Sequence, residues 1–308
     1  MTTKINYSHI ITSSINGHMH KGLIDQESIH ALFPSIKIET IRKKIKQEMA
    51  KNHNLIGKVS GIYPDTNTII EITESVLGAP INGTTLVQAN LLAKKQIDEL
   101  TTSFLKNFCQ KSLGCDYDSD TEKMTISLET LHKKLLTPYR EYLTKIDNAL
   151  VSIAGTLNQS LLVRALRSAG LSDTTQTKCF SETGSRSEGD IQIYHTGTGK
   201  SGNKILYVEA KSYAARERLL RGLADIKTPK VGVGFFNNSS EFSAKRVELL
   251  ATSAHTQAVY MPEDTYQNLT SEAKDVTYPG TGRVCRILES EFTLDMVEFN
   301  KAGAILHR

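Results

Sequence analysis

The sequence predicts an α/β protein whose core is a mixed β-sheet flanked by helices, preceded by a mainly helical region. Apolar residues recur at helical spacing through much of residues 1–145. Two short alternating runs, separated by a glycine-rich segment, then predict a β-hairpin over residues 189–211. After the hairpin, helical and strand patterns alternate, as they do in sheets built from crossover connections. We therefore divide the chain into a helical region, 1–145, and an α/β core, 146–308.

Three stretches of the chain before residue 175 have apolar side chains at helical spacing. The second ends at Gly114 and the third at Gly170, the residue type that most often follows the last turn of a helix. Pro138 breaks or kinks the third stretch, because proline cannot donate the backbone hydrogen bond of a helix interior. Residues 62–76 fit either a strand pair or a short helix, and periodicity does not decide between them. The three predicted helices span 38–53, 84–114 and 128–171.

The predicted core follows the third helix. An antiparallel hairpin comes first, and the later strands are separated by helices long enough to connect parallel neighbours. Together, a hairpin and crossover units make a mixed sheet with helices on its faces. The predicted elements are strands 189–194 and 204–211, a helix near 213–224, a strand over 230–236, a helix over 239–253, a strand over 257–262, and a strand followed by a helix within 283–299.

Composition and charge set broad limits on function. The 308 residues carry a formal net charge of +4, a mild basic bias that permits nucleic-acid binding without requiring it. No apolar run reaches the roughly 18 residues of a membrane span, and the first residues lack the apolar segment of a secretory signal. The four cysteines form no CxxC pair and no zinc-binding spacing. We therefore expect a cytoplasmic protein with reduced thiols and no membrane segment.

The glycine-rich segment HTGTGKSG, residues 195–202, superficially suggests a phosphate-binding loop. That loop needs a glycine five residues before its Gly-Lys pair, and Tyr194 occupies the position. It must also open a helix, whereas residues 203–208 have the bulky and β-branched composition of a strand. The segment is better interpreted as the turn of the hairpin, and we expect no nucleotide cofactor.

The hairpin brings three charged side chains together. If it folds symmetrically about residues 199–200, Asp190 lies opposite Glu209. Because side chains alternate along a strand, Glu209 and Lys211 share a face with Asp190. A β-bulge or a shift of one residue in register would change this pairing. The apolar pairs expected on the opposite face are Ile191 with Val208 and Ile193 with Leu206.

Paired carboxylates at one end of a hairpin suggest a metal site. At a separation of about 5 Å and an effective dielectric constant near 20, their repulsion is on the order of 3 kcal/mol. Mg²⁺ relieves such repulsion, and it binds through one or two carboxylates while keeping several waters. The backbone carbonyl of Ala210 is a candidate third ligand, and Lys211 would lie beside a metal-bound water. The alternative is a surface hairpin with an ordinary cross-strand salt bridge, which would stabilise the protein little.

The segments GDIQIY and ILYVEAKSY resemble the core motif of the PD-(D/E)XK nuclease superfamily over about residues 150–262. Gly189 stands where the motif's name has proline, a variant that is frequent in type II restriction endonucleases. The resemblance implies a restriction-endonuclease-like core. It also implies that Asp190 and Glu209 bind Mg²⁺ and that Lys211 is the catalytic lysine.

Some members of that superfamily add an acidic residue from the helix before the hairpin. In this chain that helix offers only Asp147, which is far from its C-terminal end. Glu182 and Glu188, in the loop that leads to Asp190, are the alternative candidates. The identity of a third acidic ligand therefore stays open.

The resemblance also implies an activity and a partner. A type II restriction enzyme, part of a restriction–modification system, hydrolyses phosphodiester bonds of double-stranded DNA at a specific site through a metal-activated water. Such enzymes usually act as homodimers on palindromes, because the symmetry of the protein then matches that of the DNA. Two other interpretations remain: a structure-specific repair or junction-resolving nuclease of the same superfamily, and a DNA-binding protein that does not cut.

Basic residues near the motif are candidates for DNA contacts. Three arginines follow Lys211 within one predicted helix, close enough for at least one of them to reach a phosphate. A second basic group lies in the N-terminal segment 37–51, where a solvated helix face explains the charges equally well. The candidates are Arg216, Arg218 and Arg221 in the helix, Arg186 before the hairpin, and Lys43 and Lys44 in the N-terminal segment.

Overall fold

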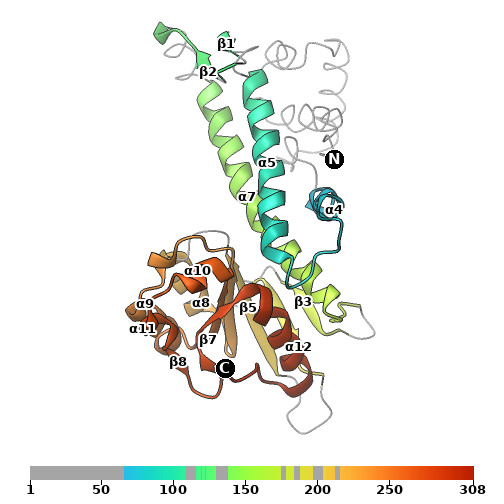
Figure 1. The fold of residues 1–308 in the computed structure, drawn as a ribbon, viewed down its shortest axis with the longest axis vertical. Coiled ribbons are helices and arrows are strands. Elements are labelled where there is room, and N and C mark those ends of the chain that lie inside the picture. Colours follow the sequence, from blue (N-terminus) through green and yellow to red (C-terminus); the bar gives the residue numbers. More distant parts are fainter. Residues whose placement is uncertain are drawn as a thin grey trace. The chain divides into compact units, whose positions relative to one another are not determined.

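The computed structural model divides the chain into two compact units (Figure 1). The second unit, residues 73–92 and 154–308, contains the central sheet and the hairpin. Described parts of the first unit include most of helix α5 (Leu86–Phe108), the beginning of α7 (Pro138–Ser168) and a small two-stranded sheet. The structure describes residues 66–108, 116–118, 120–121, 123–129, 138–174, 178–183, 188–196, 204–211 and 216–308.

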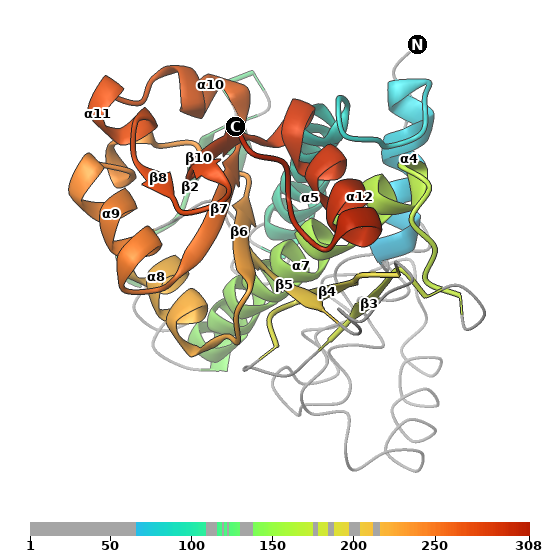
Figure 2. The same cartoon turned by 90° about the horizontal axis from the view of Figure 1, so that it is seen from below.

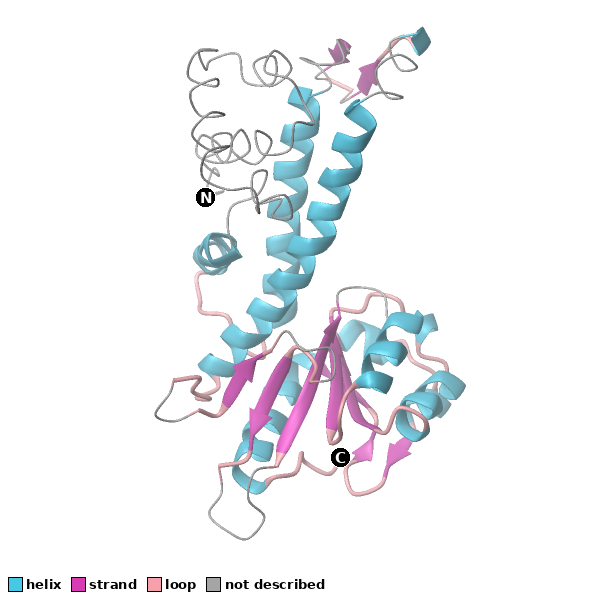
Figure 3. Ribbon diagram, turned by 180° about the vertical axis from the view of Figure 1, so that it is seen from behind, coloured by secondary structure: helices cyan, strands magenta, loops and turns pink. Residues whose placement is uncertain are grey.

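The central sheet has six strands in the order β10-β7-β6-β5-β4-β3 (Figure 3). Strands β3, β4 and β5 pair antiparallel, whereas β5, β6, β7 and β10 run parallel. The predicted mixed sheet is therefore confirmed. The strands are β3 (Phe180–Glu182), β4 (Ile191–Tyr194), β5 (Ile205–Lys211), β6 (Lys230–Gly234), β7 (Thr256–Met261) and β10 (Cys285–Ile287).

The register of the hairpin agrees with the apolar pairs expected from the sequence. Ile191 pairs with Val208, and Ile193 pairs with Leu206. All four side chains are fully buried. Burial of one face fixes the register, because a shift of one residue would turn these side chains to the other face. Since strand β5 follows the glycine-rich segment where a phosphate-binding loop needs a helix, that loop is excluded.

Helices cover both faces of the sheet (Figure 2). Helices α8 and α9 lie on one face, where Leu219 and Leu223 join a buried cluster with Phe236 and Val247. Helix α12 lies on the other face and is tied to the end of β4, because Asn300 Nδ2 donates to the Tyr194 carbonyl at 2.6 Å. The flanking helices are α8 (Arg216–Asp225), α9 (Ala244–Thr252) and α12 (Thr293–Ala302).

The long helix α7 begins at Pro138, as expected for a residue that is tolerated only in the first turn. After α7 ends, Gly170 has a φ of +88°, and the Leu171 N–H donates to the Leu166 carbonyl at 3.1 Å. This is the pattern of a glycine-terminated helix. From Thr66 onward, the undecided segment 62–76 belongs to helix α4 (Thr66–Leu77). The predicted helix over 38–53 and the predicted stop at Gly114 lie outside the described residues.

Several short elements were not expected from the sequence. They are too short to show a hydrophobic period, so no pattern in the sequence predicts them. The unexpected elements are β1 (Asp116–Asp118), β2 (Lys123–Thr125), β3, α10 (Glu263–Gln267), α11 (Ser271–Lys274), β8 (Thr277–Tyr278) and β9 (Gly282–Arg283).

In the described part of the chain, no helix combines the length and apolar composition of a membrane span.

Candidate active site

The three charged residues of the hairpin meet where its strands end. Asp190 directly precedes β4, and Glu209 and Lys211 lie in the last three residues of β5. Strand β5 runs parallel to β6, so this is the carboxyl end of a parallel pair. Ligands of α/β proteins commonly bind at that end, where the chain leaves the sheet.

Asp190 is held by a local irregularity of the hairpin. Its N–H donates to the Val208 carbonyl at 2.9 Å, although Val208 is already paired with Ile191. Two consecutive residues therefore face Val208, as in a β-bulge. The expected direct pairing of Asp190 with Glu209 is absent from the described ladder. Instead, the Asp190 carboxylate accepts a hydrogen bond from the Ala210 N–H at 2.7 Å, which still holds it beside Glu209 and Lys211.

The backbone conformation at position 189 explains why glycine, and not proline, precedes Asp190. Its φ is +69°, in the left-handed region that favours glycine. Proline cannot adopt this conformation, because its ring fixes φ near −65°. A Cβ at this position would also lie 2.7 Å from the Val208 carbonyl oxygen. The irregular approach to Asp190 therefore requires glycine on two independent grounds.

Glu209 and Lys211 form an ion pair under helix α8. The Lys211 ammonium donates to Glu209 Oε1. The Glu209 residue is only 7% exposed, whereas the Lys211 side chain is 27% exposed and reaches solvent. Gly222 of α8 lies directly over the pair, since a Cβ there would be 2.5 Å from Glu209 Oε1 and 3.3 Å from Lys211 Cε. The glycine lets the helix approach this close.

The electrostatics of the site favour added positive charge. Burial raises the pKa of Asp190, and the Ala210 N–H and the Lys211 ammonium only partly oppose this effect. Burial also raises the pKa of Glu209; the Lys211 hydrogen bond lowers it, and the nearby charge of Asp190 raises it further. One lysine therefore does not compensate two desolvated carboxylates. A proton or a metal cation would relieve the remaining repulsion.

The donor set fits a hard cation such as Mg²⁺. Asp190 Oδ2 and Glu209 Oε1 are engaged, whereas Asp190 Oδ1 and Glu209 Oε2 accept no hydrogen bond from any described residue. The Ala210 N–H points toward Asp190, and its carbonyl points to the same side of the strand. Among the described residues, no cluster of three or more His, Cys, Asp or Glu side chains could hold a metal. Two carboxylates suffice for Mg²⁺, which keeps most of its waters.

The candidates for a third acidic ligand have other partners. Glu188 accepts from Gln192 Nε2 at 3.0 Å and pairs with Lys227 at 3.1 Å. Glu182 accepts from Gln159 Nε2 at 2.9 Å. The side chain of Asp147 is outside the described set. No signal in the sequence identifies Gln159, because its contacts with Glu182 and the Asp190 carbonyl depend on how α7 packs beside the hairpin.

The basic candidates are only partly described. Arg221 is exposed on α8, one residue before Gly222. Arg216 and Arg218 also belong to α8, but their side chains lie outside the described set. Arg186, Lys43 and Lys44 lie wholly outside the described residues. Their expected contacts with DNA therefore stay predictions.

Comparison of the chain with models of known protein families, with curated proteins and with solved structures finds no match. The residues of the site and the resemblance of the motif are therefore the only indications of function.

Proposed function

We propose that this protein is a Mg²⁺-dependent, site-specific double-strand DNA endonuclease, a type II restriction enzyme. The supporting observation is the arrangement of Asp190, Glu209 and Lys211 at one end of the hairpin. Both carboxylates are desolvated, with raised pKa values, and each has one oxygen that accepts no hydrogen bond from any described residue. Two close, desolvated carboxylates that destabilise each other are costly to keep in the central sheet without a ligand.

Each residue has a distinct role in this proposal. Asp190 and Glu209, with the Ala210 carbonyl, would hold Mg²⁺. When bound, the ion supplies positive charge that lowers the pKa of a water molecule and offsets the charge of a phosphate. Lys211 is a multiple donor at the solvent-facing edge of the site. It would orient the attacking water and donate to a phosphate oxygen as negative charge develops there.

The order of elements around the site supports the finer fold assignment. Helix α7 is followed by the antiparallel strands β3 to β5 and then by crossover units through α8 and α9. We assign this order to a restriction-endonuclease-like core. The preceding helical region would contribute DNA clamping, base reading or dimer contacts. In this proposal the protein acts as a homodimer on a palindromic site.

The proposal is tested by incubating the purified protein with phage DNA in Mg²⁺ and in EDTA. We expect discrete fragments that require Mg²⁺, and sequencing of their ends would identify the recognition site. Lys211→Ala should reduce cleavage by at least about 100-fold, the usual cost of losing a catalytic acid, base or charge donor. Lys245→Ala is a matched control, because Lys245 is an exposed lysine on α9 away from the hairpin.

The alternatives predict different results in the same experiment. A structure-specific nuclease would cut branched or single-stranded DNA and give no discrete fragments from linear duplex. A non-cutting DNA-binding protein would retain DNA in a mobility-shift assay without cleaving any substrate in Mg²⁺. Cleavage that persists in Lys211→Ala would remove the central role assigned to the hairpin.

A further inference from the structure

Gln159 of helix α7 contacts the backbone of the proposed metal ligand. Its Nε2 lies 2.9 Å from Glu182 Oε2 and 3.4 Å from the Asp190 carbonyl oxygen. The same carbonyl accepts a hydrogen bond from the Thr183 N–H at 3.0 Å. Asp190 lies at the bulge, outside the regular ladder of β4 and β5. Contacts to its carbonyl therefore help to determine how its carboxylate is oriented.

Among the described residues, Gln159 forms hydrogen bonds only through the NH₂ group of its side-chain amide. The two groups that face its amide, the Glu182 carboxylate and the Asp190 carbonyl, are both acceptors. The NH₂ group must therefore face them, since an oxygen would repel both. The amide oxygen accepts no hydrogen bond from any described residue. A donor is thus required at this position, while the shape of the side chain matters less.

Helix α7 holds Gln159 on a fixed support within the second unit. The neighbouring Asn158 accepts a hydrogen bond from Asn90 at 2.7 Å, and both residues are buried. Nearly two turns further, Arg164 contacts both carboxylate oxygens of Glu74, at 3.1 and 2.8 Å. These contacts fasten α7 to the segments that begin α5 and end α4. A side chain on such an element can impose a position on a neighbouring loop.

We propose that Gln159 is a positioning residue of the Asp190–Glu209 site. This inference rests on the proposed function. Gln159 fixes the backbone of Asp190 through its carbonyl, and it holds the Glu182 carboxylate against α7 by donating a hydrogen bond to it. Its loss frees both groups, so the Asp190 carboxylate is less well placed for a metal ion. Residues that orient metal ligands in this way typically change metal affinity by about 10-fold to 100-fold.

The test is calorimetric titration of the full chain with Mn²⁺ in the absence of DNA. Gln159→Met removes the donor, and we expect Mn²⁺ to bind about tenfold more weakly. Gln159→Lys keeps a donor and should bind Mn²⁺ within about threefold of the unchanged protein. Gln159→Glu has nearly the shape of glutamine but brings a negative charge toward two acceptors, so it should bind Mn²⁺ most weakly. Gln88→Met, an exposed position on α5, is the matched control and should change nothing.

The order of the variants separates positioning from packing. A space-filling role, or the attraction of an added negative charge for Mn²⁺ alone, would make Gln159→Glu the mildest change, and that order would overturn the inference. Equal Mn²⁺ affinity in Gln159→Met and the unchanged protein would overturn it as well, while leaving the nuclease proposal intact. Absence of Asp190-dependent Mn²⁺ binding in the unchanged protein would overturn both. Thermal unfolding of each variant confirms that the compared proteins are folded, and the comparison of Gln159→Lys with Gln159→Glu is decisive even if Gln159→Met folds poorly.

Discussion

At the scale of single residues, the carboxylates of the candidate site lower the stability of the metal-free protein and provide ligands for a cation. Asp190 and Glu209 are both desolvated, and their mutual repulsion raises the pKa of Glu209. Lys211 compensates one of them and is itself half-buried. Buried charges of this kind destabilise a folded protein unless a bound ligand compensates them. Removing one carboxylate should therefore stabilise the metal-free protein.

The first prediction concerns Asp190→Asn in EDTA. Burial raises the pKa of Asp190 in the folded protein above its ordinary value of 3.8. The free energy of unfolding is therefore highest below pH 3.8, and it falls as the pH rises through the raised pKa. Asparagine keeps an acceptor for the Ala210 N–H without the charge. At pH 7.5 the variant should gain about 1 kcal/mol in free energy of unfolding, a typical size for one substitution.

Urea denaturation at pH 7.5 and at pH 4 measures this difference. The gain should shrink as pH falls toward 4, because Asp190 of the unchanged protein then takes up a proton in the folded state. Mg²⁺ should stabilise the unchanged protein and not the variant. A variant that is less stable than the unchanged protein in EDTA at neutral pH would contradict this explanation of the site.

The sequence predicted which residues meet, but not how they are held. Alternation along a strand is enough to place Glu209 and Lys211 on one face, and the apolar pairs fix the register. The bulge at Asp190 depends on one backbone conformation at Gly189, and no periodicity reveals it. The role of Gln159 depends on a contact between residues 31 positions apart, which a single sequence does not show.

At the scale of elements, helix α8 closes the site because of one glycine. Gly222 lets the helix pack against Glu209, while Leu219 and Leu223 of the same helix bury their side chains against Gly232 of β6. Lys230 fastens the C-terminal end of α8, with its ammonium bonded to the Leu223 carbonyl and to the Ile226 carbonyl at 2.7 Å. The helix is thus held rigidly over the carboxylates.

The second prediction concerns Gly222→Ala. The new Cβ would lie 2.5 Å from Glu209 Oε1, so the carboxylate must move. The moving atom ends a flexible side chain, and alanine favours a helix by about 1 kcal/mol over glycine, so stability should change by less than about 1 kcal/mol. A displacement of about 1 Å at a reacting centre costs about 100-fold in rate. DNA cleavage should therefore fall about 100-fold in a protein that remains folded.

Gly155→Ala provides the matched control on another helix. Gly155 belongs to α7, is exposed, and would place its Cβ with no atom within 4 Å. It should gain about 0.5–1 kcal/mol in stability and retain full cleavage. Unaltered cleavage in Gly222→Ala would show that α8 does not constrain the carboxylate.

The sequence predicted the long elements and missed the short ones for one physical reason. Helix α7 and strands β5 to β7 are long enough to repeat an apolar pattern, so their existence and order are confirmed. Strand β3 and helices α10 and α11 have three to five residues, less than two periods of a helix. Strand β3 forms because β4 supplies its hydrogen bonds, and α10 is anchored by the bond from Thr265 to the Phe236 carbonyl, so part of the information lies elsewhere in the chain.

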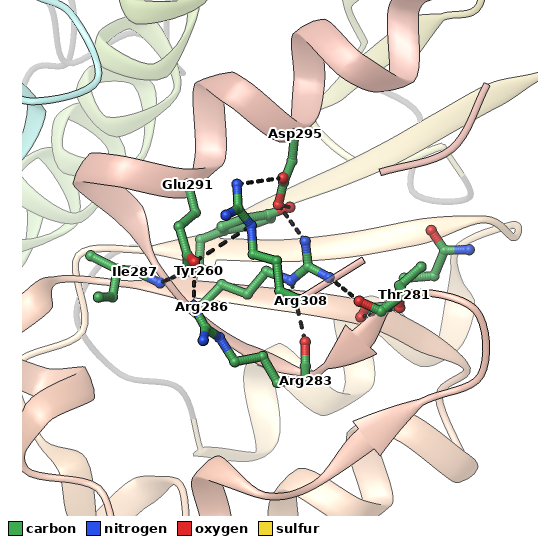
Figure 4. A network of polar contacts seen from close by, with 9 residues as sticks. Tyr260, Thr281, Arg283, Arg286, Ile287, Glu291, Asp295 and Arg308 are labelled. Atoms are coloured by element: carbon green, nitrogen blue, oxygen red, sulfur yellow. Dashed lines mark hydrogen bonds and ion pairs between the residues drawn. The ribbon is translucent and has the colours of Figure 1, made fainter. Parts of the chain in front are cut away.

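At the scale of the whole core, a buried charge network secures the edge of the sheet opposite β3 (Figure 4). Arg286 and Asp295 are both fully buried, and Arg286 NH1 lies 2.5 Å from Asp295 Oδ2. Tyr260 donates to the same oxygen at 2.8 Å, and Arg308 donates to Asp295 Oδ1 at 3.1 Å. The network joins strands β7 and β10 to helix α12 and to residue 308.

The surrounding contacts satisfy the Arg286 guanidinium on its other sides. Its NH2 donates to the Thr281 carbonyl at 2.6 Å, and its Nε donates to the Arg283 carbonyl at 3.2 Å. Glu291 adds a second acid, which accepts from Arg283 and from the Ile287 N–H at 2.6 Å. A buried ion pair contributes to stability only when its remaining donors and acceptors are satisfied in this way.

The last prediction follows from this burial. Asp295→Asn leaves the Arg286 charge uncompensated and should cost about 3–5 kcal/mol in free energy of unfolding, a large share of the roughly 5–15 kcal/mol of a typical domain. Arg167→Met removes one partner of the exposed Arg167–Asp173 pair and should cost no more than about 1 kcal/mol. Guanidinium denaturation compares the two. The double change Asp295→Leu with Arg286→Met should cost less than Asp295→Asn alone, since Arg308 keeps its ion pair with Glu291 at 3.4 Å and no buried charge is left unpaired. A double change that is worse than the single one would mean that the pair itself, and not the penalty of an orphaned charge, holds this edge of the sheet together.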